Sequence, residues 1–291
     1  MTHTTKYAYS EPVPVCHNKL HLAPRTHFNQ RCSDFRLLVI PEPAAIVSSH
    51  DYFGNRTDYF SLTDAHRGLS VTASSSMEVI DTGELLAMHV DTSWEAVQSA
   101  TASLHSDDAL ELQLLTFASD YIPVGEAYAD YARPSFAADR AIVDAITDLT
   151  RRIHEEFDYD PRTTNVSTPV EQVLAQKSGV CQDFAHFQIA CLRSVGLAAR
   201  YVSGYLRTVP PAGKPRLVGA DASHAWLSVY CGEVGWIDFD PTNNTICGTD
   251  YITIAHGRDY GDVCPIQGVF LGGGDHSMSV YVDVEAIETE K

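Results

Sequence analysis

The 291-residue sequence predicts an α+β protein, in which an antiparallel β domain precedes a core of mixed helices and strands. Three observations support this fold class. β-rich runs separated by turn residues fill the first part of the chain, helical spacing of apolar side chains follows, and the remainder alternates between helix and strand signals. We therefore expect three segments: an N-terminal β domain at 1–87, a helical connector belonging to the core at 88–157, and the core with the C-terminal strands at 158–291.

The N-terminal segment has the pattern of short strands. Runs rich in β-branched and aromatic residues occur at Phe35–Ile40, Asp58–Leu62 and Leu69–Thr72, and turn clusters such as Pro41-Glu42-Pro43 separate them. Several short strands with turn signals between them are typical of antiparallel β domains. We expect an antiparallel β-sandwich-like domain here.

The middle of the chain has the pattern of helices. Apolar residues recur three and four positions apart in 107–119 and in 137–157, as expected for one buried helix face. Thr168 and Glu171 have the spacing of a capping box around Pro169, which predicts a short helix that ends at Gly179. The next helix is expected to begin at Val180 or Cys181 and to end at Gly196.

Strand patterns follow this last helix. They cover 199–205, 225–230, 236–240 and, after Gly272 to Gly274, 278–284. A proline-rich loop is expected at Val209–Pro215. The glycine run opens no helix, so we interpret it as a turn and not as a phosphate-binding loop.

Charge and cysteine content restrict the partners and the compartment. The chain has 38 acidic and 20 basic side chains, a formal charge of −18, which repels phosphate backbones and anionic lipids. No apolar run is long enough to span a membrane, and the N-terminus lacks a signal-peptide core. Seven cysteines without a C-x-x-C pair disfavour a disulfide framework or zinc ribbon. We expect a reduced, soluble, cytoplasmic protein that binds neither nucleic acid nor membranes.

Cys181 is the candidate nucleophile. It follows Gly179 and Val180 at the expected start of a helix, where unpaired N–H groups and the positive end of the helix dipole favour a thiolate. A nucleophilic thiolate needs an imidazole to carry protons, and the imidazole needs a carboxylate to fix its tautomer. His224 at the start of one strand and Asp240 at the end of the next could supply both groups.

The local sequences around these residues carry a family resemblance. Gly-Val-Cys-Gln-Asp-Phe-Ala-His at 179–186, Ser-His-Ala-Trp at 223–226 and Trp-Ile-Asp-Phe-Asp-Pro-Thr at 236–242 resemble the signature segments of the transglutaminase-like superfamily. The first 85 residues resemble the β-rich domain that precedes this core in many bacterial members. The resemblance implies a papain-like core, in which a helix bearing the nucleophile packs on an antiparallel sheet. It also implies a triad of Cys181, His224 and Asp240, with Asp238 as the rival carboxylate.

The resemblance implies an activity class. Bacterial members are regarded as cysteine proteases or amidases, and relatives elsewhere cross-link glutamine to lysine. We expect a cysteine-nucleophile enzyme that cleaves peptide or side-chain amides of a peptide or protein substrate through a thioester, without a cofactor or metal. The oxyanion donors are expected to be the Cys181 N–H group and a side chain, for which Gln176 and Tyr159 are candidates. The alternatives are a protein-glutamine acyltransferase, a catalytically idle protein-binding scaffold, and a zinc site formed by Cys181, His224 and an aspartate.

Other prominent side chains have structural interpretations. His186 lies five positions after Cys181, on a different face of the expected helix, so a structural role is favoured. Asp158, Asp160 and Thr163 could supply oxygen ligands to calcium, but their run lacks the glycine and distal glutamate of an EF-hand loop. We therefore interpret this segment as a surface turn.

Overall fold

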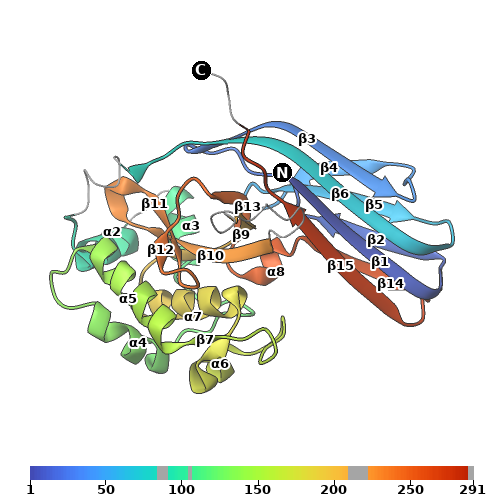
Figure 1. The fold of residues 1–291 in the computed structure, drawn as a ribbon. Coiled ribbons are helices and arrows are strands. Elements are labelled where there is room, and N and C mark those ends of the chain that lie inside the picture. Colours follow the sequence, from blue (N-terminus) through green and yellow to red (C-terminus); the bar gives the residue numbers. More distant parts are fainter. Residues whose placement is uncertain (84–90, 104–106, 209–221, 288–291) are drawn as a thin grey trace, which may run out of the picture.

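A computed structural model describes residues 1–83, 91–103, 107–208 and 222–287 (Figure 1). The expected proline-rich loop at Val209–Pro215 lies outside these residues. Figure 1 shows the helices gathered at one end of the molecule and the long strands of the N-terminal domain at the other. None of the helices in the described ranges is both long and apolar enough to cross a membrane. The α+β fold class is confirmed.

The N-terminal domain consists of two four-stranded antiparallel sheets. Their strand orders are β15-β1-β6-β3 and β14-β2-β5-β4. Alternate side chains are buried along β6, which is the pattern of a sheet with one solvent face. The apolar side chains enclosed by this domain include Val13, Leu20, Leu22, Val71 and Ala73. The first six strands are β1 (Thr2–Val13), β2 (Val15–Leu20), β3 (Gln30–Ile40), β4 (Ile46–His50), β5 (Arg56–Leu62) and β6 (His66–Val79).

The last two strands complete the N-terminal sheets. β14 (Ile266–Leu271) pairs with β2, and β15 (His276–Asp283) pairs with β1. The turn between them contains Gly272, Gly273 and Gly274, all at positive φ, where glycine carries little strain. This agrees with the predicted turn. The boundaries at 87 and 157 stay a prediction.

The core is a five-stranded antiparallel sheet with helices packed on it. The strand order is β12-β11-β10-β9-β13. The strands are β9 (Ala199–Leu206), β10 (Ala222–Tyr230), β11 (Trp236–Asp240), β12 (Thr245–Ile246) and β13 (Tyr251–Gly257). A further two-stranded parallel pair joins β7 (Asp158–Tyr159) to β8 (Ser178–Gly179).

Helix α7 (Cys181–Ser194) lies against β9 and β10 at the centre of the core. It is buried on nearly every face, because other helices cover the side that the sheet leaves open. Phe184, Phe187 and Leu192 are among its fully enclosed side chains. The other helices among the described residues are α2 (Trp94–Ser103), α3 (Asp107–Leu114), α4 (Glu126–Ala132), α5 (Ile142–Glu156), α6 (Val170–Gln176) and α8 (Tyr260–Val263), with short 3₁₀ turns at Arg133–Ser135 and Gly232–Val234.

The predicted capping box before α6 is wrong. The N-cap residue is Pro169, and no side chain caps this helix. The Thr168 hydroxyl instead accepts a hydrogen bond from the Asn165 N–H group at 2.9 Å, inside the preceding turn. The helix ends at Gln176, and Lys177 follows in the left-handed conformation.

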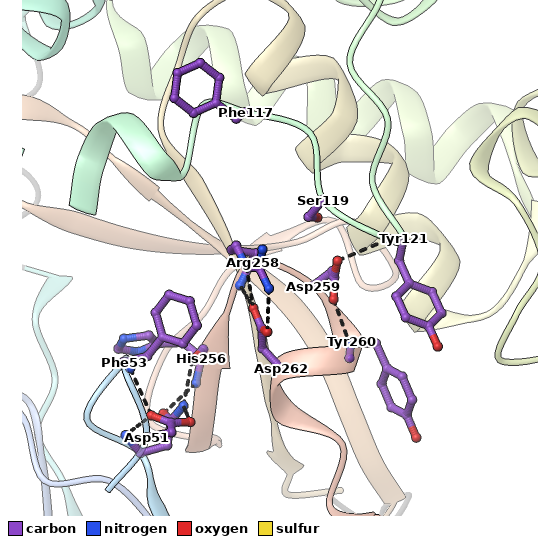
Figure 2. A network of polar contacts seen from close by, with 12 residues as sticks. Asp51, Phe53, Phe117, Ser119, Tyr121, His256, Arg258, Asp259, Tyr260 and Asp262 are labelled. Carbon is purple, nitrogen blue, oxygen red and sulfur yellow. Dashed lines mark hydrogen bonds and ion pairs between the residues drawn. The ribbon is translucent and has the colours of Figure 1, made fainter. Parts of the chain in front are cut away.

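Two buried amides of the N-terminal domain cover β13, an edge strand of the core sheet. The Gln30 side chain donates to the Thr253 carbonyl and accepts from the Thr253 N–H group, both at 2.8 Å. The Asn55 side chain makes the same pair of bonds with the His256 backbone, at 2.8 and 3.0 Å. Figure 2 shows the loop with Asp51 and Phe53 lying against His256. These amides replace the hydrogen bonds of a neighbouring strand and thereby join the two domains.

We expect Gln30→Ala to lower the free energy of unfolding by about 2 kcal/mol, because it leaves the Thr253 N–H group buried without a partner, while the Thr253 carbonyl keeps only its bond from the Arg25 N–H group. Urea unfolding measures the change. Gln267→Ala is the matched control, since Gln267 is exposed on β14 and its loss should change stability by less than about 0.5 kcal/mol. Equal effects of the two substitutions would contradict the role given to Gln30.

Three buried histidines predict loss of stability in acid. Burial lowers the pKa of His3 to about 4, that of His186 to about 3, and that of His256 well below 6.5. Between about pH 6.5 and pH 4 the unfolded chain binds protons at these sites, whereas the folded protein does not. The stability that these three sites contribute is therefore full above pH 6.5 and is lost as the pH falls through this window, by about 1.4 kcal/mol per pH unit for each histidine.

Urea midpoints at neutral and mildly acidic pH measure this loss. His3→Gln should remove about a third of the three-histidine slope. His50→Gln, at an exposed position of β4, should leave the slope unchanged. A stability that stays constant as the pH falls would contradict the prediction.

Candidate active site

Cys181 is the first residue of α7, as the sequence predicts, and its side chain is partly exposed. The neighbouring Asp183 fixes the start of this helix, because its carboxylate accepts hydrogen bonds from the Val180 N–H group at 2.8 Å and the Thr164 hydroxyl at 2.7 Å. A Cβ atom at Gly179 would lie 2.7 Å from the same carboxylate, so glycine is required there. The thiol is thereby held at the N-terminal end of the helix.

His224 lies on β10 and faces both partner groups. Its Nε2 atom is 2.7 Å from Oδ2 of Asp240. Burial lowers the pKa of His224, but hydrogen bonds to the Asp240 carboxylate and the Cys181 thiol, together with their charges, outweigh burial and raise it from 6.5 to about 10. Because Nε2 is occupied by Asp240, Nδ1 is the nitrogen left for the thiol. The imidazole therefore favours its protonated form at neutral pH.

Asp240 is fully buried at the end of β11 and accepts hydrogen bonds at both oxygens. Oδ1 accepts from the Thr242 and Asn243 N–H groups. Oδ2 accepts from the Asn243 amide at 2.6 Å and the Tyr251 hydroxyl at 2.7 Å, in addition to His224. Burial alone would raise the pKa of this carboxyl, but these bonds and the charge of His224 hold it below its usual value. Asp240 thus stays ionised beside the imidazole.

The structure brings Cys181, His224 and Asp240 together and separates Asp238 from them. Oδ2 of Asp238 accepts a hydrogen bond from the indole N–H of Trp226 at 2.9 Å. Trp226 itself is completely buried, as expected for a core residue. The rival carboxylate thus positions a tryptophan ring instead of the imidazole.

Two residues of the site were not predicted from the sequence. Asn243 lies in the turn directly after Asp240, so its position next to the carboxylate could have indicated it. Tyr251 gives no local signal, because it comes from β13, which pairs with β9 and not with β10 or β11. Its ring lies 5.3 Å from that of Trp226 and 6.2 Å from that of His224.

The two candidate oxyanion side chains are placed differently. Tyr159 on β7 is 58% exposed, and burial of its hydroxyl, together with the nearby Cys181 thiol, raises its pKa. Gln176 is exposed at the last residue of α6, and no contact of the described residues joins its amide to Cys181 or His224. Proximity therefore favours Tyr159.

The other singled-out residues have structural contacts. His186 is buried and accepts a hydrogen bond from the Tyr260 N–H group at 3.2 Å. Asp160 forms a bidentate ion pair with Arg162 on the surface. Within the described ranges, no group of three or more His, Cys, Asp or Glu side chains is arranged to hold a metal ion.

Tyr251→Phe is expected to slow the reaction of Cys181 with iodoacetamide roughly tenfold near neutral pH, because Asp240 loses one of the hydrogen bonds that fix its orientation and so positions the imidazolium less precisely beside the thiolate. Mass spectrometry of the alkylated peptide measures the rate. Tyr52→Phe is the control, since Tyr52 is exposed in the N-terminal domain. An alkylation rate unchanged by Tyr251→Phe would show that the Tyr251 hydroxyl does not support the Asp240–His224 pair.

Two family models match the chain. One, described as the bacterial transglutaminase-like N-terminal region, matches residues 1–78. The other, the transglutaminase-like superfamily, matches residues 129–241, which include the three residues of the site. Each of these two parts of the chain is therefore similar to a transglutaminase-like family.

Relatives match the whole chain or part of it. An uncharacterized protein from Mycobacterium tuberculosis is 40% identical over 99% of this chain and 92% of its own. A protein-glutamine gamma-glutamyltransferase from Pseudomonas aeruginosa is 35% identical over 123 residues, which are 41% of this chain and 18% of its own. The crystal structure of a candidate cysteine protease from Cytophaga hutchinsonii has a TM-score of 0.73 at 21% identity, covering 99% of this chain and 92% of that one. This last likeness shows a shared fold.

Proposed function

Since the chain belongs to the transglutaminase-like superfamily, we propose that it is a cysteine-nucleophile enzyme that cleaves peptide or side-chain amide bonds. The observation that carries this proposal is the 2.7 Å bond between His224 and the buried Asp240, with the Cys181 thiol at the N-terminus of α7 near enough to contribute to the raised pKa of the imidazole. A nucleophile, a proton carrier and an orienting carboxylate are the groups that thiol acyl transfer requires. The substrates proposed are peptides or proteins.

The reaction proceeds in two steps. Sγ of the Cys181 thiolate attacks the amide carbonyl carbon, and as the C–N bond breaks, the His224 imidazolium gives its proton to the departing amine, which leaves a thioester. Water then attacks the thioester carbon and gives a proton to His224. Breakage of the C–S bond releases the carboxylic acid and regenerates the thiolate.

The oxyanion formed in each step needs preorganised donors. The Cys181 N–H group belongs to the first turn of α7, where backbone donors lack partners within the helix. The Tyr159 hydroxyl is the proposed second donor, since it is near the thiol and Gln176 has no contact with the site.

The second candidate function is transfer of the acyl group to an amine. The similarity of 123 residues to a protein-glutamine gamma-glutamyltransferase favours this alternative. Hydrolysis is preferred because the relative that matches the fold over 99% of the chain carries the name of a cysteine protease. Glutamine-containing peptides offered with and without a fluorescent primary amine separate the two functions. Ammonia release without amine incorporation supports hydrolysis, and stoichiometric incorporation supports transfer.

Alkylation by iodoacetamide across about pH 5 to 9 tests the activated nucleophile. The His224 imidazolium persists up to about pH 10, so the labelling rate of Cys181 should remain high at the acidic end of this range. His224→Ala should restore the steep rise with pH of a free thiol, whereas the exposed-site control His50→Ala should not. If the native chain and His224→Ala have the same profile, the protein is better described as an idle scaffold.

A further inference from the structure

A cavity of about 570 Å³ lies on the other face of the core sheet from α7. Arg200 and Val202 of β9 point into it, while the alternating residues Ala199 and Tyr201 belong to the apolar core around α7. The opposite wall comes from residues 25–30 of the N-terminal domain. Neither Cys181 nor the other two residues of the triad line this cavity.

Arg200 is the central charged group of the cavity. Its guanidinium stacks on Trp236 at 3.9 Å from the ring centroid. Nη1 lies 3.2 Å from Nε2 of His256, whereas Nε is buried without a hydrogen-bond partner. None of the ion pairs found among the described residues includes Arg200. The Nε side of the guanidinium thus has no hydrogen-bond partner among the described residues, and the edge formed by Nε and Nη2 is the one that can donate to both oxygens of a planar carboxylate.

The remaining lining restricts the ligand further. Phe28, Val202 and Ile237 supply apolar walls, and Nε2 of His27 is a second buried nitrogen without a partner. Arg25 also borders the cavity, but its Nη1 donates to the Phe53 carbonyl and to Oδ1 of Asn55. Asp238 and Glu233 border it as well, and these two carboxylates disfavour a doubly charged phosphate. A ligand with one negative charge and an apolar body fits a cavity that combines apolar walls with a few polar groups.

We propose that this cavity is a binding site for a small carboxylic acid with an apolar body. The carboxylate lies against the free edge of the Arg200 guanidinium, and the body contacts Trp236 and the apolar walls. The site is separate from the thiol, although Tyr251 borders both the cavity and the Asp240 carboxylate.

Calorimetric titration with linear carboxylates from butanoate to octanoate tests the site. Binding should be saturable and should tighten roughly threefold with each methylene group until the cavity is filled. Octanamide, which keeps the body but lacks the charge, should bind at least about tenfold more weakly. Octanoate should also bind the Cys181→Ala protein with unchanged affinity.

Variants of Arg200 link the binding to the guanidinium. Arg200→Met should weaken octanoate binding at least about tenfold, and Arg36→Met, at an exposed residue of β3, should not. If Arg200→Met fails to fold, Arg200→Lys keeps the charge but loses the bidentate edge, and the same weakening is expected. Absence of saturable binding, equal binding of octanamide or inorganic phosphate, or loss of binding in Cys181→Ala would each overturn the proposal. Loss of octanoate binding in Cys181→Ala would overturn this proposal but would leave the proposed cysteine-enzyme function intact.

Discussion

A burst of p-nitrophenolate, equal to the enzyme concentration, is expected when the native protein is mixed with p-nitrophenyl acetate, and no burst is expected from Cys181→Ala. This ester acylates activated thiolates directly, so the test does not depend on the natural substrate. Removing the nucleophile should lower amide turnover by roughly 10⁵-fold or more, since no other group of the site can form the thioester. Stopped-flow absorbance measures the burst.

Cys32→Ala is the matched control for this experiment. Cys32 is, like Cys181, a partly exposed free cysteine, but it lies on β3, in the N-terminal domain. Its thiol hydrogen-bonds to the Asp34 carbonyl and has no imidazole partner among its described contacts. The burst should persist in this variant. A burst that survives Cys181→Ala would show that another group is acylated.

Asp240→Asn is expected to slow turnover by roughly 10³- to 10⁴-fold while the protein remains folded. The asparagine side chain is nearly the same size as the carboxylate, but it carries no charge to hold the imidazolium. The pKa of His224, now about 10, should fall toward its ordinary value. The proton needed by the departing amine would then be supplied less readily at neutral pH.

Asp238→Asn provides a control two residues away on the same strand. Asp238 bonds to the indole of Trp226 and not to His224, so its replacement should change turnover by less than about tenfold. NMR titration of His224 measures the pKa directly in both variants. Equal losses in the two variants would indicate that the fold, and not the charge of Asp240, determines the rate.

Local sequence was sufficient to predict the parts of the site that depend on neighbouring residues. The glycine before Cys181 and the apolar spacing after it placed the start of α7 correctly. The preference for Asp240 over Asp238 came from the family resemblance of the segment that contains Asp-Pro-Thr, and Asp240 is the carboxylate that bonds to His224. The start of the helix acts within a few residues, so one sequence contains the necessary information.

Side-chain contacts that depend on which distant strands lie next to each other were not predictable from the sequence. Tyr251 reaches Asp240 because β13 lies beside β9, and no local pattern specifies that neighbour. The capping-box prediction at Thr168 was wrong because a turn with Asn165 competes for the same hydroxyl. Gln30 and Asn55 look like ordinary polar residues until the edge strand they cover is known.

The pairing of the first and last strands also has a consequence for the order of folding. Thr2 of β1 pairs with Asp283 of β15, so one N-terminal sheet is completed only after the ribosome has released the end of β15. α7 and the sheet strands that carry the catalytic groups emerge earlier and can assemble first. Closing so long a loop is slow compared with helix formation. We therefore expect newly made chains to pass through a state in which the core is formed while β1 still has an unpaired edge.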